Sequence, residues 1–390
     1  MLSGSGSLFL MKRILIANVF LLAVLFSAKA ETAAGDPASL DAIKTYLVNT
    51  VQQMDEASHD FVTNAAAYQA IIDAAGGDYD RAAAAHGVEL GELVKKMQAD
   101  FGIYHNHGYE TIEGIVAGTK KMVWFDNYLD GGVPATDAST DSPESPLVLR
   151  ARDGTMISNH NGNLFHYVIE PTLWGTRGFF LKKLSPEAQA KLKEQYEAAL
   201  GGKISAAPVA LPRADVLTAA SLDCAEKLDM LLKVAQEWQP QLGECIGALV
   251  WMTPTLNGYF DDWRDSRYNP VATGHYVAES RVLDMRGIMY SLKITCDAIL
   301  PQLQLKNPGL ADQMEYEYAN IIAFIDRVEA RDAKSGYRMS IPAIEELAEQ
   351  AKTLTDQLQP QLRQMAAILN APIPEKPTLV AFDIPQGARK

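Results

Sequence analysis

Apolar residues recur at helical spacing in the stretch that follows residue 39. They stand at Leu40, Ile43, Leu47, Val51, Met54, Phe61, Ala65, Tyr68 and Ile72. Steps of three and four residues place such side chains on one face of a helix. Ser39 is suited to cap the first turn, and Gly76-Gly77 interrupts the pattern. The spacing therefore predicts a long amphipathic helix from about residue 39 to residue 75.

Similar spacing predicts helices along most of the remaining chain. A second helix is expected from about residue 78 towards His107, and a third from near Gly108 to about Asn127. Further helices are expected at 164–174, 186–200, 213–236, 240–268, 276–305, 309–332 and 341–370. Strand-type alternation is nearly absent. The pattern therefore predicts an all-α fold.

Two polar stretches divide these helices. Glycine, proline, serine and aspartate cluster from Asp130 to Gly162, which predicts a loop of about thirty residues, long enough to be functional or mobile. Gly201-Gly202 and the prolines at 208–212 resemble a linker. We expect two antiparallel helical-bundle halves, residues 31–205 and 206–371, that form one elongated body, followed by a proline-rich tail at 372–390.

The first thirty residues have the pattern of a signal peptide. If Met11 is the start, Lys12-Arg13 is a charged region, 14–26 is an apolar segment, and 28–30 reads A-x-A, as at a cleavage site. The apolar segment is about thirteen residues, which is short for a membrane span, and no later segment is longer. The sequence predicts an exported protein, by default in the bacterial periplasm, with no membrane span in the mature chain.

The net charge narrows the choice of partners. It is −13 for the whole chain, and it becomes −16 without residues 1–30, which contain three basic residues and no acid. Nucleic acid and anionic membrane surfaces are poor partners for such a surface, whereas cations are good ones. An acidic surface also serves solubility alone, which is the commoner reason for it.

Three cysteines, Cys224, Cys245 and Cys296, lie on predicted helices without CxxC spacing. We interpret them first as small buried apolar residues. An oxidising compartment would also permit one disulfide, of Cys224 with Cys245 or Cys296.

The segment from His105 to Glu113 holds the densest set of potential metal ligands. On a helix His107, Glu110 and Glu113 would step three residues at a time along one face, within reach of a shared cation. Carboxylates and imidazole are ligands for iron, manganese or zinc, and helical bundles often hold such metals with them. The alternative is an ordinary exposed polar face.

A second set of ligand-type residues is His166 and Glu170, which stand four residues apart. Such a pair shares a helix face and is structural more often than it is a site. It is not the H-E-x-x-H zinc-protease motif, which the chain lacks, as it lacks G-x-S-x-G, Walker and dinucleotide-binding motifs. In the second half Glu279 with Arg286, and Asp284 with Arg281, could be plain ion pairs.

The order of these clusters resembles the imelysin/EfeO-like family of exported helical proteins linked to iron. Residues 109–113 (YETIE) resemble its H-Y-E-x-I-E-P stretch, and 125–130 resemble its L-D-x-x-I-D stretch. Residues 165–175 resemble G-F-H-R-x-E-x-x-L-W/F-G, with Tyr167 in place of the family's histidine and His166 one position earlier. Residues 275–285, 299–303 and 306–310 resemble later family segments, so the likeness covers nearly the whole mature chain.

The resemblance implies a periplasmic iron-binding protein of an iron-uptake system, without the family's cupredoxin module. It implies a cation held by Glu110, Glu113 and Asp130, joined by Glu279, with His166 and Glu170 as a second set. It also implies an inner-membrane iron permease or a peroxidase-type protein as partner. Besides iron, manganese, zinc and calcium remain open as the cation.

Two other function classes remain open. Imelysin itself is classed as a peptidase, which would require an open metal position and a general base. Some relatives bind acidic polysaccharide, and Trp124, Trp174, Trp251 and Trp263 could stack on sugar rings, although tryptophans at such positions are more often core.

Overall fold

The structure is a computed structural model that describes residues 40–131, 146–159, 161–174, 211–266 and 276–378, with the side chains of 265, 266 and 276–279 left out. It is mostly helical, as the sequence predicts. The described residues belong to one compact unit. Several predictions concern residues outside the described ranges and stay predictions: the signal peptide, the Ser39 cap, the helix at 186–200, the division near residue 205 and the end of the tail.

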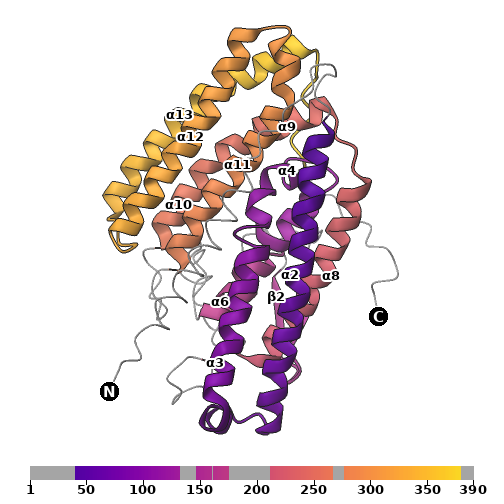
Figure 1. The fold of residues 1–390 in the computed structure, drawn as a ribbon, viewed down its shortest axis with the longest axis vertical. Coiled ribbons are helices and arrows are strands. Elements are labelled where there is room, and N and C mark those ends of the chain that lie inside the picture. The colour runs from indigo at the N-terminus through magenta and orange to yellow at the C-terminus, as the bar shows by residue number, and fades with distance from the viewer. Residues whose placement is uncertain (1–39, 132–145, 160, 175–210, 267–275, 379–390) are drawn as a thin grey trace, which may run out of the picture. The chain divides into compact units, whose positions relative to one another are not determined.

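The long helix α2 (Asp41–Ala74) packs along two others, α3 (Tyr79–Tyr104) and α8 (Ala214–Glu237) (Figure 1). The predicted apolar face of α2 is buried from Ile43 to Ile72, because its spacing turns these side chains towards α3 and α8. The second helix ends at Tyr104, three residues before the predicted end at His107.

A second set of helices follows: α9 (Leu242–Met252), α10 (Leu256–Ser266), α11 (Tyr276–Gln304), α12 (Pro308–Lys334) and α13 (Ile341–Leu369). α11 packs on α10 and α12, and α13 packs on the same two helices. The last three match their predicted ranges closely. The single helix predicted at 240–268 is interrupted by the short 3-10 helix η5 (Thr253–Thr255), where Pro254 has no backbone N–H to donate.

The predicted helix from Gly108 to Asn127 is wrong. The chain forms four short pieces instead: the 3-10 helix η1 (Tyr109–Thr111), α4 (Glu113–Val116), α5 (Val123–Asp126) and the π-helix η2 (Asn127–Gly131). Close contacts with other helices accompany the breaks in this segment. A Cβ on Gly114 would lie 2.5 Å from Ser291 Oγ, and one on Gly118 would lie 2.4 Å from the Ala248 Cβ. Contacts with α9 and α11 therefore decide the path of this segment.

Part of the predicted loop from Asp130 to Gly162 is a β-hairpin. Strands β1 (Leu147–Arg150) and β2 (Met156–Asn159) pair antiparallel, with Leu147 opposite Asn159. The π-helix η3 (Phe165–Ile169) and α6 (Glu170–Trp174) follow, within the predicted helix at 164–174. Each strand has only four residues, too few for alternation to stand out in the sequence.

Cys224, Cys245 and Cys296 are buried and free, as the first interpretation of them expects.

Among the described residues, none of the helices is both long enough and apolar enough to cross a membrane.

Candidate metal centre

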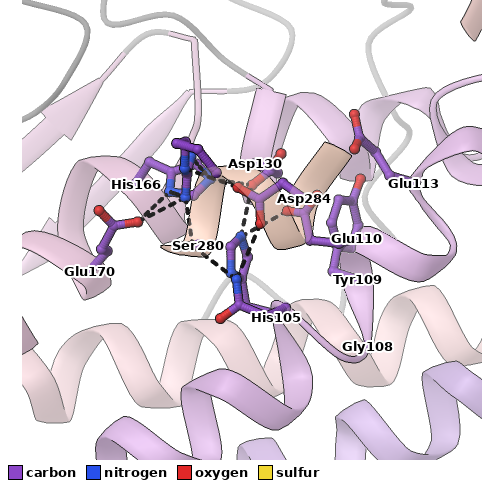
Figure 2. Close-up of polar contacts among 12 residues, drawn as sticks. His105, Gly108, Tyr109, Glu110, Glu113, Asp130, His166, Glu170, Ser280 and Asp284 are labelled. Carbon is purple, nitrogen blue, oxygen red and sulfur yellow. Dashed lines mark hydrogen bonds and ion pairs between the residues drawn. The ribbon is translucent and has the colours of Figure 1, made fainter. Parts of the chain in front are cut away.

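Four buried side chains converge beside α11: His105, Glu110, Asp130 and His166 (Figure 2). One ligand atom from each lies within 4.8 Å of the others. Nε2 of His105 is 2.9 Å from Glu110 Oε1 and 3.3 Å from Asp130 Oδ1, and Nε2 of His166 is 2.7 Å from the same Asp130 oxygen. Asp130 therefore links the two histidines.

His105 and Glu110 lie on either side of a sharp break in the chain. α3 stops at Tyr104, the His105 N–H donates to Phe101 O, and the His105 ring stacks on Phe101 at 4.7 Å. Gly108 permits the turn, since a Cβ there would lie 2.4 Å from Met54 Cγ. The chain then returns through η1, and the Glu110 N–H donates to His105 O at 3.1 Å.

Glycine in α11 brings Glu110 close to that helix. A Cβ on Gly287 would lie 2.7 Å from the Cβ of Glu110 and 2.8 Å from its carbonyl carbon. The backbone of η1 therefore sits directly on α11, and the Glu110 side chain is held in the interior.

Asp130 and His166 both come from π-helical turns, η2 and η3, which contact each other. A π-turn fits one residue more than an α-turn, and such turns are frequent at functional sites because they redirect side chains. Both side chains are at most 6% exposed.

Backbone contacts join η2 to η3. Gly162 has φ +77°, and a Cβ there would lie 2.4 Å from Asn127 O. The Asn163 N–H donates to that same carbonyl at 3.0 Å, and Asn163 Oδ1 accepts from the His166 N–H at 2.9 Å. Asn163 itself has φ +62°. This tight turn fixes the distance between Asp130 and His166.

The pKa values of the two carboxyl groups in the cluster are shifted in opposite directions. Burial alone would raise the pKa of Asp130, but His166 and His105 hold it well below its ordinary value. Burial, together with Asp284 and Asp130, raises the pKa of Glu110 well above its ordinary value. Although His105 Nε2 is 2.9 Å from Oε1, neither Glu110 oxygen accepts a hydrogen bond from a described residue. Glu110 is thus a buried carboxyl group that contacts His105 but accepts no hydrogen bond from a described residue.

Further charged groups surround this cluster. Glu170 Oε2 lies 2.8 Å from His166 Nδ1, on the side of the ring away from Asp130, as Figure 2 shows. Arg281 Nη2 donates to Glu170 at 3.1 Å, and Arg281 Nε lies 2.9 Å from Asp284 Oδ2. Burial would raise the pKa of Glu170, but Arg281 and His166 hold it below its ordinary value.

Glu113 and Asp126 lie outside the group of four. Tyr259 OH donates to Glu113, and Tyr109 OH donates to Asp126 at 2.9 Å. Burial, followed by Glu110 and Asp126, raises the pKa of Glu113 well above its ordinary value. Burial and Asp130 raise the pKa of Asp126 to about 7. Acidic groups therefore outnumber basic groups around the site, and burial favours the protonated form of several of them.

Only some of the candidate ligands named from the sequence come together in the structure. Glu110, Asp130 and His166 belong to the group of four. Glu170 contacts it from behind His166, and Glu113 stands apart from it. The helix face of His107, Glu110 and Glu113 does not form, because the chain breaks at Tyr104, and His107 is exposed. The side chain of Glu279 lies outside the described residues.

His105 is the group member that the helical-spacing argument missed. A spacing of five residues to Glu110 matches no single helix face, so the pair shares a site only because the chain turns between them. Gly108 between the two is the signal that could have indicated the break.

The arrangement could hold a metal ion. Ligand bonds of about 2.1 Å place neighbouring ligand atoms about 3 Å apart around an ion, close to the 2.7–3.3 Å separations found here. Two imidazoles with two carboxylates suit first-row transition metals.

Comparison of the chain with protein-family models, curated proteins and solved structures found no match.

Proposed function

We propose that this protein binds a transition-metal cation, iron in the first place, through His105, Glu110, Asp130 and His166. The observation that carries the proposal is the carboxyl group of Glu110, fully buried beside three other ligand-type side chains and without a hydrogen bond from any described residue. Burial of a carboxylate that accepts no hydrogen bond is costly, and a bound cation lowers that cost.

The donor set supports a divalent ion. Glu110 and Asp130 contribute two negative charges when ionised, which a divalent cation neutralises. Calcium prefers oxygen ligands alone, whereas imidazole suits iron and zinc, and two histidines with a carboxylate are typical of ferrous sites. We infer that ferrous iron, manganese and zinc fit better than calcium.

Glu170 supports His166 as a ligand through Nε2. Metal-bound histidines usually donate their second N–H to a carboxylate, which fixes the tautomer and the ring orientation. Nδ1 of His166 lies 2.8 Å from Glu170, and Nε2 faces Asp130. We therefore assign Glu170 the orienting role and not that of a direct ligand.

The wider role follows from the sequence. We propose a periplasmic protein of iron uptake, similar to the imelysin/EfeO-like family, that passes its ion to an inner-membrane permease or a peroxidase-type protein. The signal-peptide pattern at 1–30 and the motif order support this role.

Burial weakens the two alternatives. A peptidase needs substrate beside its metal, whereas the four side chains here are at most 6% exposed. Sugar stacking needs accessible rings, but Trp124, Trp174 and Trp263 are buried, and the ring of Trp251 is covered by the guanidinium of Arg363 at 5.6 Å.

The test is anaerobic calorimetric titration of the metal-depleted protein with ferrous, manganese, zinc and calcium ions. We expect one ion per chain, a weaker response to calcium, and at least a roughly hundredfold loss of affinity in Asp130→Asn. Asp326→Asn, at an exposed carboxylate on α12, is the matched control. Absence of binding, or binding that Asp130→Asn leaves intact, would refute the proposal.

A further inference from the structure

Arg281 contacts the candidate metal centre at one of its ligand-type side chains. Its Nη1 lies 3.1 Å from His166 Nε2, and its Nη2 lies 3.2 Å from His166 Nδ1. The guanidinium is buried and also contacts Glu170, Ser280 and Asp284. It is thus a permanent positive charge beside the imidazole nitrogen that faces Asp130.

The guanidinium of Arg281 and a metal ion would both have to lie next to Nε2 of His166. A metal ion on Nε2 would use the ring lone pair, and Arg281 Nη1, 3.1 Å from that nitrogen, lies beside the position that the ion would occupy. A cation bound to Nε2 would also lie within a few ångströms of a second cation in a buried environment, where like charges repel strongly.

An alternative partner for the guanidinium is already in place. Asp284 Oδ2 is fully buried and lies 2.9 Å from Arg281 Nε, yet it accepts no hydrogen bond from a described residue. A small rotation of the guanidinium towards Asp284 would give that oxygen a donor and free Nε2 of His166. Glu170 and Ser280 remain within reach of Nη2 during such a movement.

We propose that Arg281 competes with the metal ion for His166, so that the ion binds only as the guanidinium turns from Nε2 towards Asp284. Arg281 thereby weakens the site and speeds release of the ion, which suits a carrier more than a permanent metalloprotein. This inference rests on the proposed metal binding at the same site, and it adds a residue that governs how readily the ion leaves.

The experiment compares wild type with Arg281→Gln. We expect Arg281→Gln to bind zinc or ferrous iron at least about tenfold more tightly, because the repulsion and the competition both disappear. We also expect slower loss of the ion to an added chelator. Arg286→Gln lies on the same helix but removes an exposed pair with Asp326, so it should match wild type in both measurements.

Two further measurements cover a folding defect in Arg281→Gln. The double variant Arg281→Gln/Asp284→Asn removes both charges of the pair, leaves no unpaired buried carboxylate at position 284, and should show the same gain in affinity. A crystal structure of the zinc-loaded wild type should show Arg281 Nη1 well beyond its present 3.1 Å from His166 Nε2.

The outcomes separate this inference from the proposed function. If wild type binds an ion and folded Arg281→Gln or the double variant binds it equally or more weakly, competition is refuted while metal binding stands. An unmoved guanidinium in the zinc-loaded structure refutes it as well. If neither wild type nor these variants bind any ion, both proposals fail.

Discussion

Glu110 combines two properties that stability alone does not favour. Its carboxyl group is fully buried, and neither oxygen accepts a hydrogen bond from a described residue. Such a group normally raises the free energy of the folded state by about 1–3 kcal/mol. A residue that costs stability and still occupies the interior is best explained by function.

We therefore predict opposite effects of Glu110→Gln on stability and on binding. At a pH at which the buried Glu110 is ionised, the neutral glutamine should let the metal-free variant unfold at a higher urea concentration, with a gain of about 1 kcal/mol or more. Its metal affinity should fall at least about a hundredfold, because a carboxylate ligand is lost.

Urea unfolding in the presence of a chelator and calorimetric titration measure the two effects. Glu92→Gln is the control, since Glu92 is exposed and pairs with a surface lysine. A variant that is less stable without metal would show that Glu110 has a structural partner, and the argument from its burial would fail.

At the residue scale the sequence predicted three of the four clustered side chains. Glu110, Asp130 and His166 were found through carboxylate and histidine spacing together with the family resemblance. His105 was missed because spacing arguments assume a continuous helix. Its place in the site depends on a chain reversal that involves a close contact of Gly108 with Met54, far away in the sequence.

At the scale of elements, two π-turns and the tight turn before η3 hold the site together. η2 carries Asp130, η3 carries His166, and the turn at Gly162 and Asn163 joins them through Asn127. None of these contacts uses a ligand side chain. The geometry of the site can thus be disturbed from the backbone alone.

We predict that Gly162→Ala lowers both stability and metal affinity. Its φ of +77° is unfavourable for alanine, and the added Cβ would lie 2.4 Å from Asn127 O. The loss should be about 2 kcal/mol or more, with at least a tenfold weaker ion affinity as η2 and η3 separate.

Gly154→Ala provides the matched control for this prediction. Gly154 has φ +89°, but nothing lies within 4 Å of its added Cβ. It should lose about 1 kcal/mol from backbone strain alone and bind metal like wild type. Equal metal affinities in the two variants would show that this turn does not position the ligands.

The boundaries of long helices were predicted more accurately than those of short elements. α11, α12 and α13 end within two residues of prediction because an apolar face repeated over many turns outweighs local exceptions. The pieces between Tyr109 and Gly131 were predicted as one helix because each is too short to show a period. Their boundaries arise from contacts of Gly114 and Gly118 with α11 and α9, which no local pattern contains.

At the scale of the whole molecule, a bound ion should stabilise the fold. The ligands come from the residue after α3 and from η1, η2 and η3, so unfolding would disperse them. An ion at about one hundred times its dissociation constant should add roughly 2.7 kcal/mol. A melting experiment with and without a chelator should show a rise of several degrees with the favoured ion, and Asp130→Asn should show almost none.

The metal-free protein should also become less stable as the pH rises from about 5 to about 8. Burial raises the pKa of Glu110, Glu113 and Asp126, the last to about 7. The folded chain therefore keeps protons that the unfolded chain has released, and this contribution is lost as the pH passes the folded-state pKa values. The lowered pKa of His107 acts in the opposite sense.

Urea unfolding at a series of pH values, with a chelator present, measures this slope. Asp126→Asn should flatten part of it, because the proton that Asp126 retains in the folded chain is gone. A saturating metal ion should reduce the slope further by neutralising the carboxylates directly. A metal-free stability that climbs steadily from about pH 5 to about pH 8 would contradict the assignment.

The four ligand-type side chains and their neighbouring positive charge come from separate parts of the chain. The former lie between residues 105 and 166, whereas Arg281 belongs to α11, which supplies none of the four. Ion choice and ion retention can thus change independently in evolution or in the laboratory. Substitutions on α11 would change the rate at which the ion dissociates without altering any coordinating atom.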